Sequence, residues 1–272
     1  MYNISPTEMK RMLEQTLVPP IGVTELDPGS VKAATSRLAS SRGTAGESYH
    51  LRSNLTPASL TRLTPESTVK VIKDFYFSTA TEGADRLVAE GSTKVVSVEA
   101  LAAEMAPVLA PCWSEPPVAG ALYYVDVLIV AGGALWKQVP GRPLLTFEGT
   151  WGLGEFAALQ AAIPGAPDLS LPDRRVVFLT GALTRAQYVH GERGYRSMMT
   201  SAGLVAGALV RTCFVPTTDW RPVLVESFLD RDVNRLLRND GVDRAAVSMI
   251  ALSRIPRQAD QHLPQPTEGH HD

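Results

Sequence analysis

Cysteine is scarce in this chain, which excludes a scaffold held together by disulfides. Cys112 and Cys213 lie far apart in apolar surroundings, so we expect two reduced thiols of the kind found in cytoplasmic proteins. No cysteines or histidines stand at the intervals that zinc sites use. The sequence therefore predicts no metal site. The five histidines are His50, His190, His262, His270 and His271.

Excess charge and long apolar runs are also missing. The chain has 26 Lys and Arg against 28 Asp and Glu, a formal net charge of −2, which does not favour binding to nucleic acid or to an anionic membrane. The longest apolar run, 125–135, is broken by Asp126 and two glycines, and it is shorter than the roughly 20 residues of a membrane-spanning helix. The N-terminus lacks the basic region and apolar core of a signal peptide. We therefore expect a cytoplasmic protein.

Glycine-rich phosphate loops are absent, since neither a Walker pattern nor G-x-G-x-x-G occurs, and P-loop and Rossmann proteins are not indicated. The composition is that of an ordinary globular protein, with 272 residues of which 44% are hydrophobic. Residues 1–66 read as an N-terminal arm, which opens with a capped helix at Ser5. Residues 67–256 form the predicted domain, and residues 257–272 form a polar tail that we expect to be disordered.

The middle of the chain predicts alternating strands and helices, hence an α+β fold with a mixed or antiparallel sheet. Residues 122–130 and 174–180 are almost continuously apolar and predict strands buried on both faces. Residues 139–147 predict a hairpin that turns at Pro140 and Gly141. The other expected elements are helices at 98–105 (capped by Ser97), 157–163 and 230–238 (capped by Asp230), and strands at 222–228 and 247–252.

The most distinctive segment is a tight turn, Gly-Glu-Arg-Gly-Tyr-Arg, at 191–196. Glycines there permit left-handed backbone angles and close approach of the chain. Apolar residues at three- and four-residue spacing follow and predict a helix at 195–213 with a broad buried stripe. Gly203 and Gly207 lie on that helix at a cost of roughly 1 kcal/mol each relative to Ala. We therefore expect another helix, a subunit or a flat ligand to pack closely against them.

Three segments together resemble the nitroreductase-like flavoproteins, in particular their SagB-type or McbC-like branch. Residues 117–123, Pro-Val-Ala-Gly-Ala-Leu-Tyr, are similar to a loop that enters the strand beside the flavin. The 191–196 turn matches the family's turn before its central helix. Residues 227–237 and 249–256 are similar to the family's closing segments, and residues 49–53 to a Tyr-His element upstream.

The resemblance covers residues 85 to about 256 and implies a nitroreductase-like homodimer that binds FMN. It further implies oxidation of a peptide-borne azoline during peptide natural-product biosynthesis, with partner proteins in a complex. The residues placed at the flavin by the resemblance are Arg86, Val118, Ala119, Gly120 and Arg254. The residues placed at the substrate are His190 and Tyr195 as catalytic groups, with Arg193 and Arg196 as binding groups.

The chain departs from the family where the flavin phosphate is bound. The family's run of cations before its first helix falls on residues 85–89, where Arg86 is the basic residue and Asp85 would repel a phosphate. The loop serine is replaced by Val118, and an asparagine of the central helix by Ala208. A phosphate dianion favours several cations, so each of these changes weakens the predicted FMN site.

The family's Lys-Tyr pair, which is associated with removal of the substrate proton, falls on Val189 and His190. Valine has no basic group, whereas an imidazole serves as a base near neutral pH. The alternatives are that His190 is a surface histidine, that Tyr195 packs under the start of the helix, and that Arg193 and Arg196 form structural ion pairs.

Three functions remain open from the sequence. The first is an enzyme, an FMN-dependent oxidoreductase acting on an azoline. The second is a degenerate relative that acts as a partner or scaffold in a peptide-modifying complex. The third is flavin-free chemistry in the emptied pocket.

Overall fold

Strands and helices alternate along the described part of this computed structural model, which comprises residues 64–163, 169, 174–215, 218–225 and 227–255. The strands are β1 (Val95–Ser97), β2 (Val125–Ala131), β3 (Ala134–Gln138), β4 (Leu144–Thr150), β5 (Arg174–Ala182), β6 (Trp220–Val225) and β7 (Arg244–Arg254). The helices are α5 (Glu66–Ala89), α6 (Val98–Ala102), α7 (Ala106–Leu109), α8 (Pro111–Ser114), α9 (Pro116–Ala121), α10 (Leu153–Ala162), α11 (Leu183–His190), α12 (Gly194–Thr212) and α13 (Asp230–Leu236), with 3₁₀ turns at η1 (Ala103–Met105) and η2 (Gly191–Arg193). The predicted α+β class is confirmed. The predicted helix at Ser5 and the tail 257–272 lie outside the described residues.

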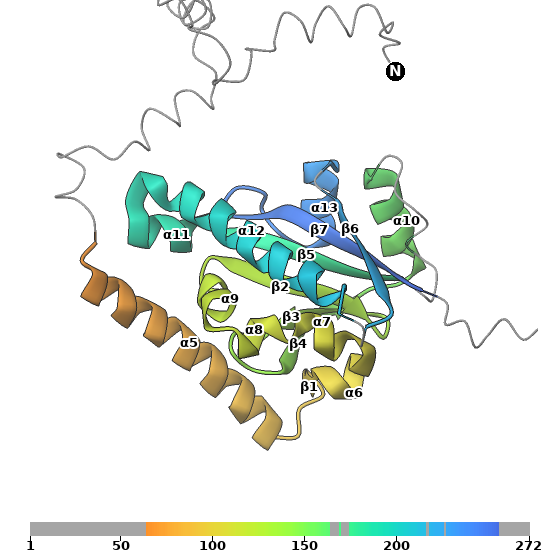
Figure 1. The fold of residues 1–272 in the computed structure, drawn as a ribbon, viewed down its shortest axis with the longest axis horizontal. Helices are drawn as coiled ribbons and strands as arrows, with labels where there is room; N and C mark the ends of the chain where they lie inside the picture. The colour runs from red at the N-terminus through yellow and green to blue at the C-terminus, as the bar shows by residue number, and fades with distance from the viewer. Residues whose placement is uncertain (1–63, 164–168, 170–173, 216–217, 226, 256–272) are drawn as a thin grey trace, which may run out of the picture. The chain divides into compact units, whose positions relative to one another are not determined.

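The described strands form one antiparallel sheet in the order β1-β4-β3-β2-β5-β7-β6 (Figure 1). The central pair, β2 and β5, is in register from Val125 opposite Gly181 to Val130 opposite Val176. β1 and β6 are the two edge strands, and α13 lies in the chain between β6 and its neighbour β7.

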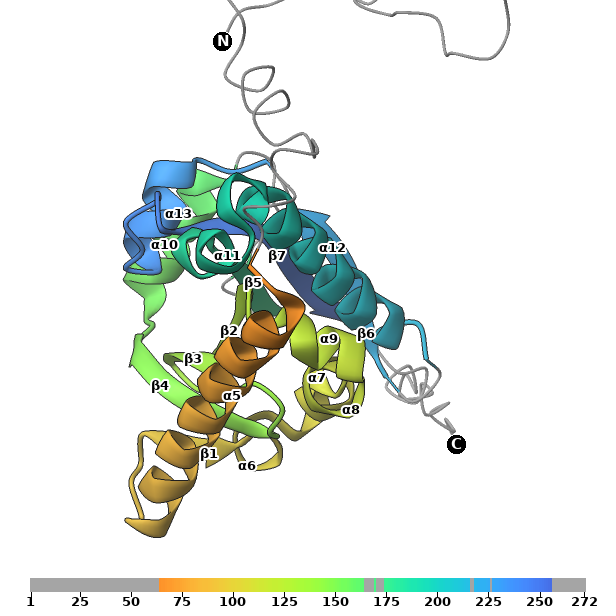
Figure 2. The same ribbon diagram turned by 90° about the vertical axis from the view of Figure 1, so that its left-hand side faces the viewer.

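Alternate residues of the central strands enter different cores, because side chains of a strand point to opposite faces. Val127 and Ile129 of β2 join a core with α12 and the short helices α6 to α9. Leu128 and Val130 join a second core with α10 and α13. Figures 1 and 2 show the two helical layers on the two faces of the sheet. The prediction of strands buried on both faces is thereby confirmed.

The structure confirms the predicted cap at Ser97 and the predicted turn at Gly141, and it differs at two helix ends. The Ser97 Oγ accepts a hydrogen bond of 3.0 Å from the backbone N–H of Ala100, as predicted for a helix cap. Gly141 has a positive φ of 71° at the turn between β3 and β4. The helix after Ser97 changes to a 3₁₀ turn at Ala103, earlier than predicted. Asp230 is not the cap of α13, because the helix already begins there and Leu229 precedes it.

Two elements differ from the sequence analysis. Residues 66–89 form the 24-residue helix α5, which was not predicted. Val69, Ile72 and Tyr76 stand at helical spacing on it and pack partly buried against the core, and Ala84 is its one buried residue. Arg86 therefore lies in the last turn of a helix, not in a loop before one. Residues 117–121, expected in a loop, continue the helix α9.

Candidate functional site

The turn at 191–196 joins α11 to α12, and each of its glycines has a structural reason. Gly191 has a φ of +57°, which side-chain-bearing residues rarely adopt. A Cβ on Gly194 would lie 2.5 Å from the backbone carbonyl carbon of Ala186, because α11 and α12 cross closely there. The turn thus fixes where α11 ends, and with it the position of His190.

His190 ends α11 and meets a tyrosine from the start of the sheet. The Tyr124 hydroxyl and His190 Nε2 are joined by a hydrogen bond of 2.7 Å, and their rings lie 5.5 Å apart. The Lys73 ammonium, from α5, lies 4.6 Å from the centre of the Tyr124 ring. Residues 73, 124 and 190 are far apart in sequence, so sequence patterns gave no sign of this cluster. The neighbouring Val189 is buried in the core and contributes nothing to it.

The electrostatics of this cluster favour a neutral imidazole. Burial, with Lys73 and Arg193 adding repulsion, lowers the pKa of His190 below its usual value. Burial raises the pKa of Tyr124 to about 12, so its hydroxyl keeps its proton. Burial lowers the pKa of Lys73. A neutral imidazole bonded to a neutral phenol can accept a proton, which is what a general base requires.

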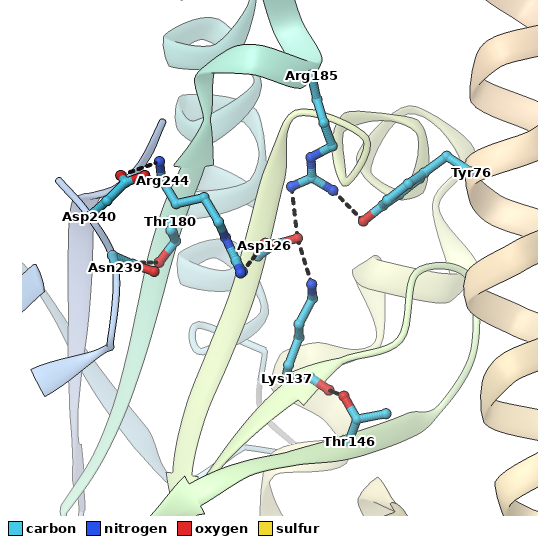
Figure 3. A network of polar contacts seen from close by, with 9 residues as sticks. All are labelled: Tyr76, Asp126, Lys137, Thr146, Thr180, Arg185, Asn239, Asp240 and Arg244. Atoms are coloured by element: carbon cyan, nitrogen blue, oxygen red, sulfur yellow. Dashed lines mark hydrogen bonds and ion pairs between the residues drawn. The ribbon is translucent and has the colours of Figure 1, made fainter. Parts of the chain in front are cut away.

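A second polar network surrounds Asp126, the buried acid at the start of β2. Its carboxylate contacts Lys137 Nζ at 3.2 Å, Arg185 Nη2 at 2.9 Å and Arg244 Nη2 at 2.6 Å. Arg185 also donates a hydrogen bond to the Tyr76 hydroxyl. Figure 3 shows these groups converging from α5, α11 and three strands. Burial raises the pKa of the Asp126 carboxyl, but the three cations outweigh it and hold that pKa at about 2. The network ties α5 and α11 to the sheet.

An open apolar groove runs beside α12. Its lining residues include Gly203 and Gly207, and its volume is about 350 Å³. A Cβ built at either glycine meets nothing within 4 Å beyond its own helix, so the prediction of close packing is wrong for contacts within the described chain. The other lining residues are Met199, Ala202, Ala206, Val210, Phe214, Pro222, Leu224, Val247 and Ser248.

The predicted substrate residues lie around the turn. Tyr195 is exposed on α12 and lines a cavity of about 320 Å³ with Met198, Asp230 and Asp243 among others. The charge of Arg193 contributes to lowering the pKa of His190, so the fold brings these two residues close together. Arg193 and Arg196 are half-buried and neither is without a partner. Their roles in binding or catalysis stay predictions.

The predicted cofactor residues do not meet. Arg86 is exposed near the end of α5, about 20 Å along that helix from Lys73 at 1.5 Å per residue. Its neighbour Asp85 pairs with Arg142 at 2.8 Å. Arg254 is exposed at the end of β7. α5 leads into the edge strand β1, whereas Arg254 lies on β7, and five strand spacings, about 24 Å, separate β1 from β7.

The resemblance implies FMN, and the residues present do not fit its phosphate. Arg86 and Arg254 are too far apart to bind one phosphate group, and each is a single cation. Val118 is buried in the core and offers no donor, whereas Ala119 and Gly120 are half-buried in α9. The concentration of cations that does exist, around Asp126, is bound to that carboxylate. No FMN site can therefore be built from the predicted residues of one chain.

The described residues include no metal-ligand group, no reactive cysteine and no membrane-spanning helix. They contain no group of three or more His, Cys, Asp or Glu placed to hold a metal. Burial raises the pKa of Cys112 to about 12 and of Cys213 to about 11, so neither forms a reactive thiolate. In the same part of the chain, no helix combines the length and the apolar character needed to cross a bilayer.

Comparison with known proteins finds similar solved structures but no matching sequence. A chain described as a nitroreductase from Anabaena variabilis has 24% identity and a TM-score of 0.44, covering 52% of this chain and 29% of that one. The Escherichia coli microcin synthetase McbBCD complex with truncated pro-MccB17 bound has 14% identity and a TM-score of 0.48, covering 75% and 99%. A chain described as a nitroreductase from Ralstonia eutropha has 12% identity and a TM-score of 0.43, covering 57% and 73%. This chain thus spans less than a third of the Anabaena protein. No protein-family model and no curated protein matches it.

Proposed function

We propose that this chain is a SagB-type, nitroreductase-like protein that acts as a partner subunit in a peptide-modifying biosynthetic complex, without a tightly held FMN of its own. The observation that carries the proposal is the dispersal of the residues that the resemblance assigns to the cofactor. A phosphate dianion needs forked or multiple cations at one place. Arg86 lies near the end of α5, which leads into β1, and Arg254 lies at the end of β7 instead.

The α12 groove supports a role in association. Several apolar side chains on and beside it are exposed, among them Phe214 at 73%, Leu204 and Leu224. Exposed apolar patches of this kind mark protein interfaces. The bare backbone at Gly203 and Gly207 allows another helix to approach closely. We propose that a second copy of the chain covers this face, forming a homodimer that then joins the complex.

The experiment compares FMN with riboflavin, which lacks the phosphate, by calorimetric titration of the full chain. We expect both to bind equally weakly, because Arg86 and Arg254 do not combine into one phosphate site among the described residues. A matched variant, Arg86→Ala, should change neither affinity. FMN affinity about a hundredfold above that of riboflavin, corresponding to about 2.7 kcal/mol, would overturn the proposal.

A second function, an FMN-dependent dehydrogenase that oxidises a peptide-borne azoline, is favoured by the cluster of His190, Tyr124 and Lys73. Such an enzyme needs a base for the substrate proton, and the neutral imidazole provides one. This function predicts FMN binding that depends on Arg86. It also predicts that His190→Gln abolishes azoline oxidation while leaving FMN binding unchanged.

A further inference from the structure

A slot lies between α5 and the body of the domain, away from the α12 groove. One face of α5 forms its first wall, and Tyr123 and Arg185 form the other. Its volume is about 320 Å³ and its walls are almost entirely apolar, within the usual range for small-ligand cavities. The α5 residues that line it are Ile72, Phe75, Tyr76, Thr79 and Ala80.

A continuous row of rings connects this slot to His190. Tyr76 and Tyr123 line the slot and meet edge to face, with ring centres 5.4 Å apart. Tyr123 meets Tyr124 in the same way at 5.0 Å. The Tyr124 hydroxyl then bonds to the His190 imidazole. The row of rings therefore leads from the slot to the polar cluster described above, whose residues do not line the slot themselves.

Lys73 lies next to the slot, behind its lining residue Tyr123. Its ammonium lies over the rings of Tyr124 and Tyr123, at 4.6 and 5.8 Å. Arg185 has Asp126 as its counterion at 2.9 Å, but no carboxylate among the residues that the structure describes pairs with Lys73. The side chain is half-buried, and a partly desolvated cation without a counterion is unfavourable. A half-buried ammonium without a carboxylate partner among the described residues favours an anion beside the apolar slot.

We propose that the slot binds a small apolar carboxylate, with its apolar body between α5 and Tyr123 and its carboxylate on the Lys73 ammonium. Arg185, on the other wall, keeps Asp126 as its counterion. The ligand chemistry is shared by two sources, the carboxyl terminus of a peptide that ends in an apolar residue and a free aromatic or branched acid. The site is separate from the α12 face and does not depend on the proposed role of that face.

The test titrates the full chain with N-acetylphenylalanine and, as the uncharged match, with N-acetylphenylalaninamide. We expect the acid to bind about tenfold more tightly, the size of one charge-assisted contact. Lys73→Met should lower the affinity for the acid to the affinity for the amide. Lys70→Met is the matched control, because Lys70 is exposed on the same helix one turn earlier. This variant should still bind the acid more tightly than the amide.

A second variant tests the slot itself. Ala80→Leu fills the cavity and should abolish binding of both probes without lowering the melting temperature. The full chain is then titrated with a tripeptide ending in phenylalanine and with free 3-phenylpropionate. Whichever binds more tightly shows whether the ligand is a peptide carboxyl terminus or a free acid. Equal affinity for acid and amide, no binding of the acid, or unchanged preference in Lys73→Met would overturn the proposal.

Discussion

Replacing the two open glycines of α12 with alanine should stabilise the isolated chain. Glycine in a helix interior costs about 0.8–1.0 kcal/mol relative to alanine. At Gly203 and Gly207 the new methyl groups meet nothing within 4 Å beyond their own helix, so nothing offsets the gain. The double variant Gly203→Ala/Gly207→Ala should therefore gain about 2 kcal/mol. For a domain of this size, that raises Tm by roughly 4–8 °C.

Gly194→Ala should destabilise the chain, in contrast to the substitutions of Gly203 and Gly207. Its Cβ would lie 2.5 Å from the backbone of Ala186 and of Gln187, and backbone cannot move aside as a side-chain tip can. We expect a loss of at least about 1–3 kcal/mol, the usual cost of overpacking. The assay is thermal unfolding followed by circular dichroism, at dilutions where sedimentation shows a monomer.

The same alanines should weaken self-association at higher concentration, because the proposed second copy needs the bare backbone. Destabilisation of the dilute double variant to the extent of Gly194→Ala would refute the description of an open groove. If sedimentation of the double variant at high concentration is unchanged, the α12 groove is not the interface between two copies.

Three further results are expected. Asp126→Asn should cost about 3–5 kcal/mol, because it leaves three cations without their buried counterion. In the unsubstituted chain, the folded pKa of about 2 lies below the usual aspartate value of 3.8. This stabilisation is therefore present above pH 3.8 and is lost as the pH falls toward 2. Urea unfolding against pH measures both effects. The pKa of His190, followed by NMR, should lie below its usual value and should rise in Lys73→Met, since a repelling charge is removed. Cys112 and Cys213 should resist a thiol reagent in the native chain and react after unfolding, and rapid native labelling would contradict their burial.

The sheet could be predicted from sequence because its signals are local. Continuous apolar runs located β2 and β5, and the Pro140–Gly141 pair located the hairpin turn. α5 was missed although Val69, Ile72 and Tyr76 stand at helical spacing, because exposed apolar residues such as Val71 and Phe75 lie between them and blur the pattern. The glycine turn was found, but its reason is the crossing of α11 and α12, which no local pattern contains.

The site was predicted only in part for the same physical reason. His190 stands out through its place next to the turn, whereas Tyr124 and Lys73 reach it through tertiary folding. The resemblance assigned Arg86 and Arg254 to one cofactor, and the sheet separates them. Val118 shows the limit most plainly, since a residue expected beside the flavin is packed into the core.

The most direct test is the visible absorption spectrum of the purified full chain, recorded after incubation with excess FMN and removal of unbound flavin. The account predicts a colourless protein, because the predicted phosphate contacts Arg86 and Arg254 do not form one site. A retained flavin band that is lost in Arg86→Ala would contradict it and would support a flavin-dependent function instead.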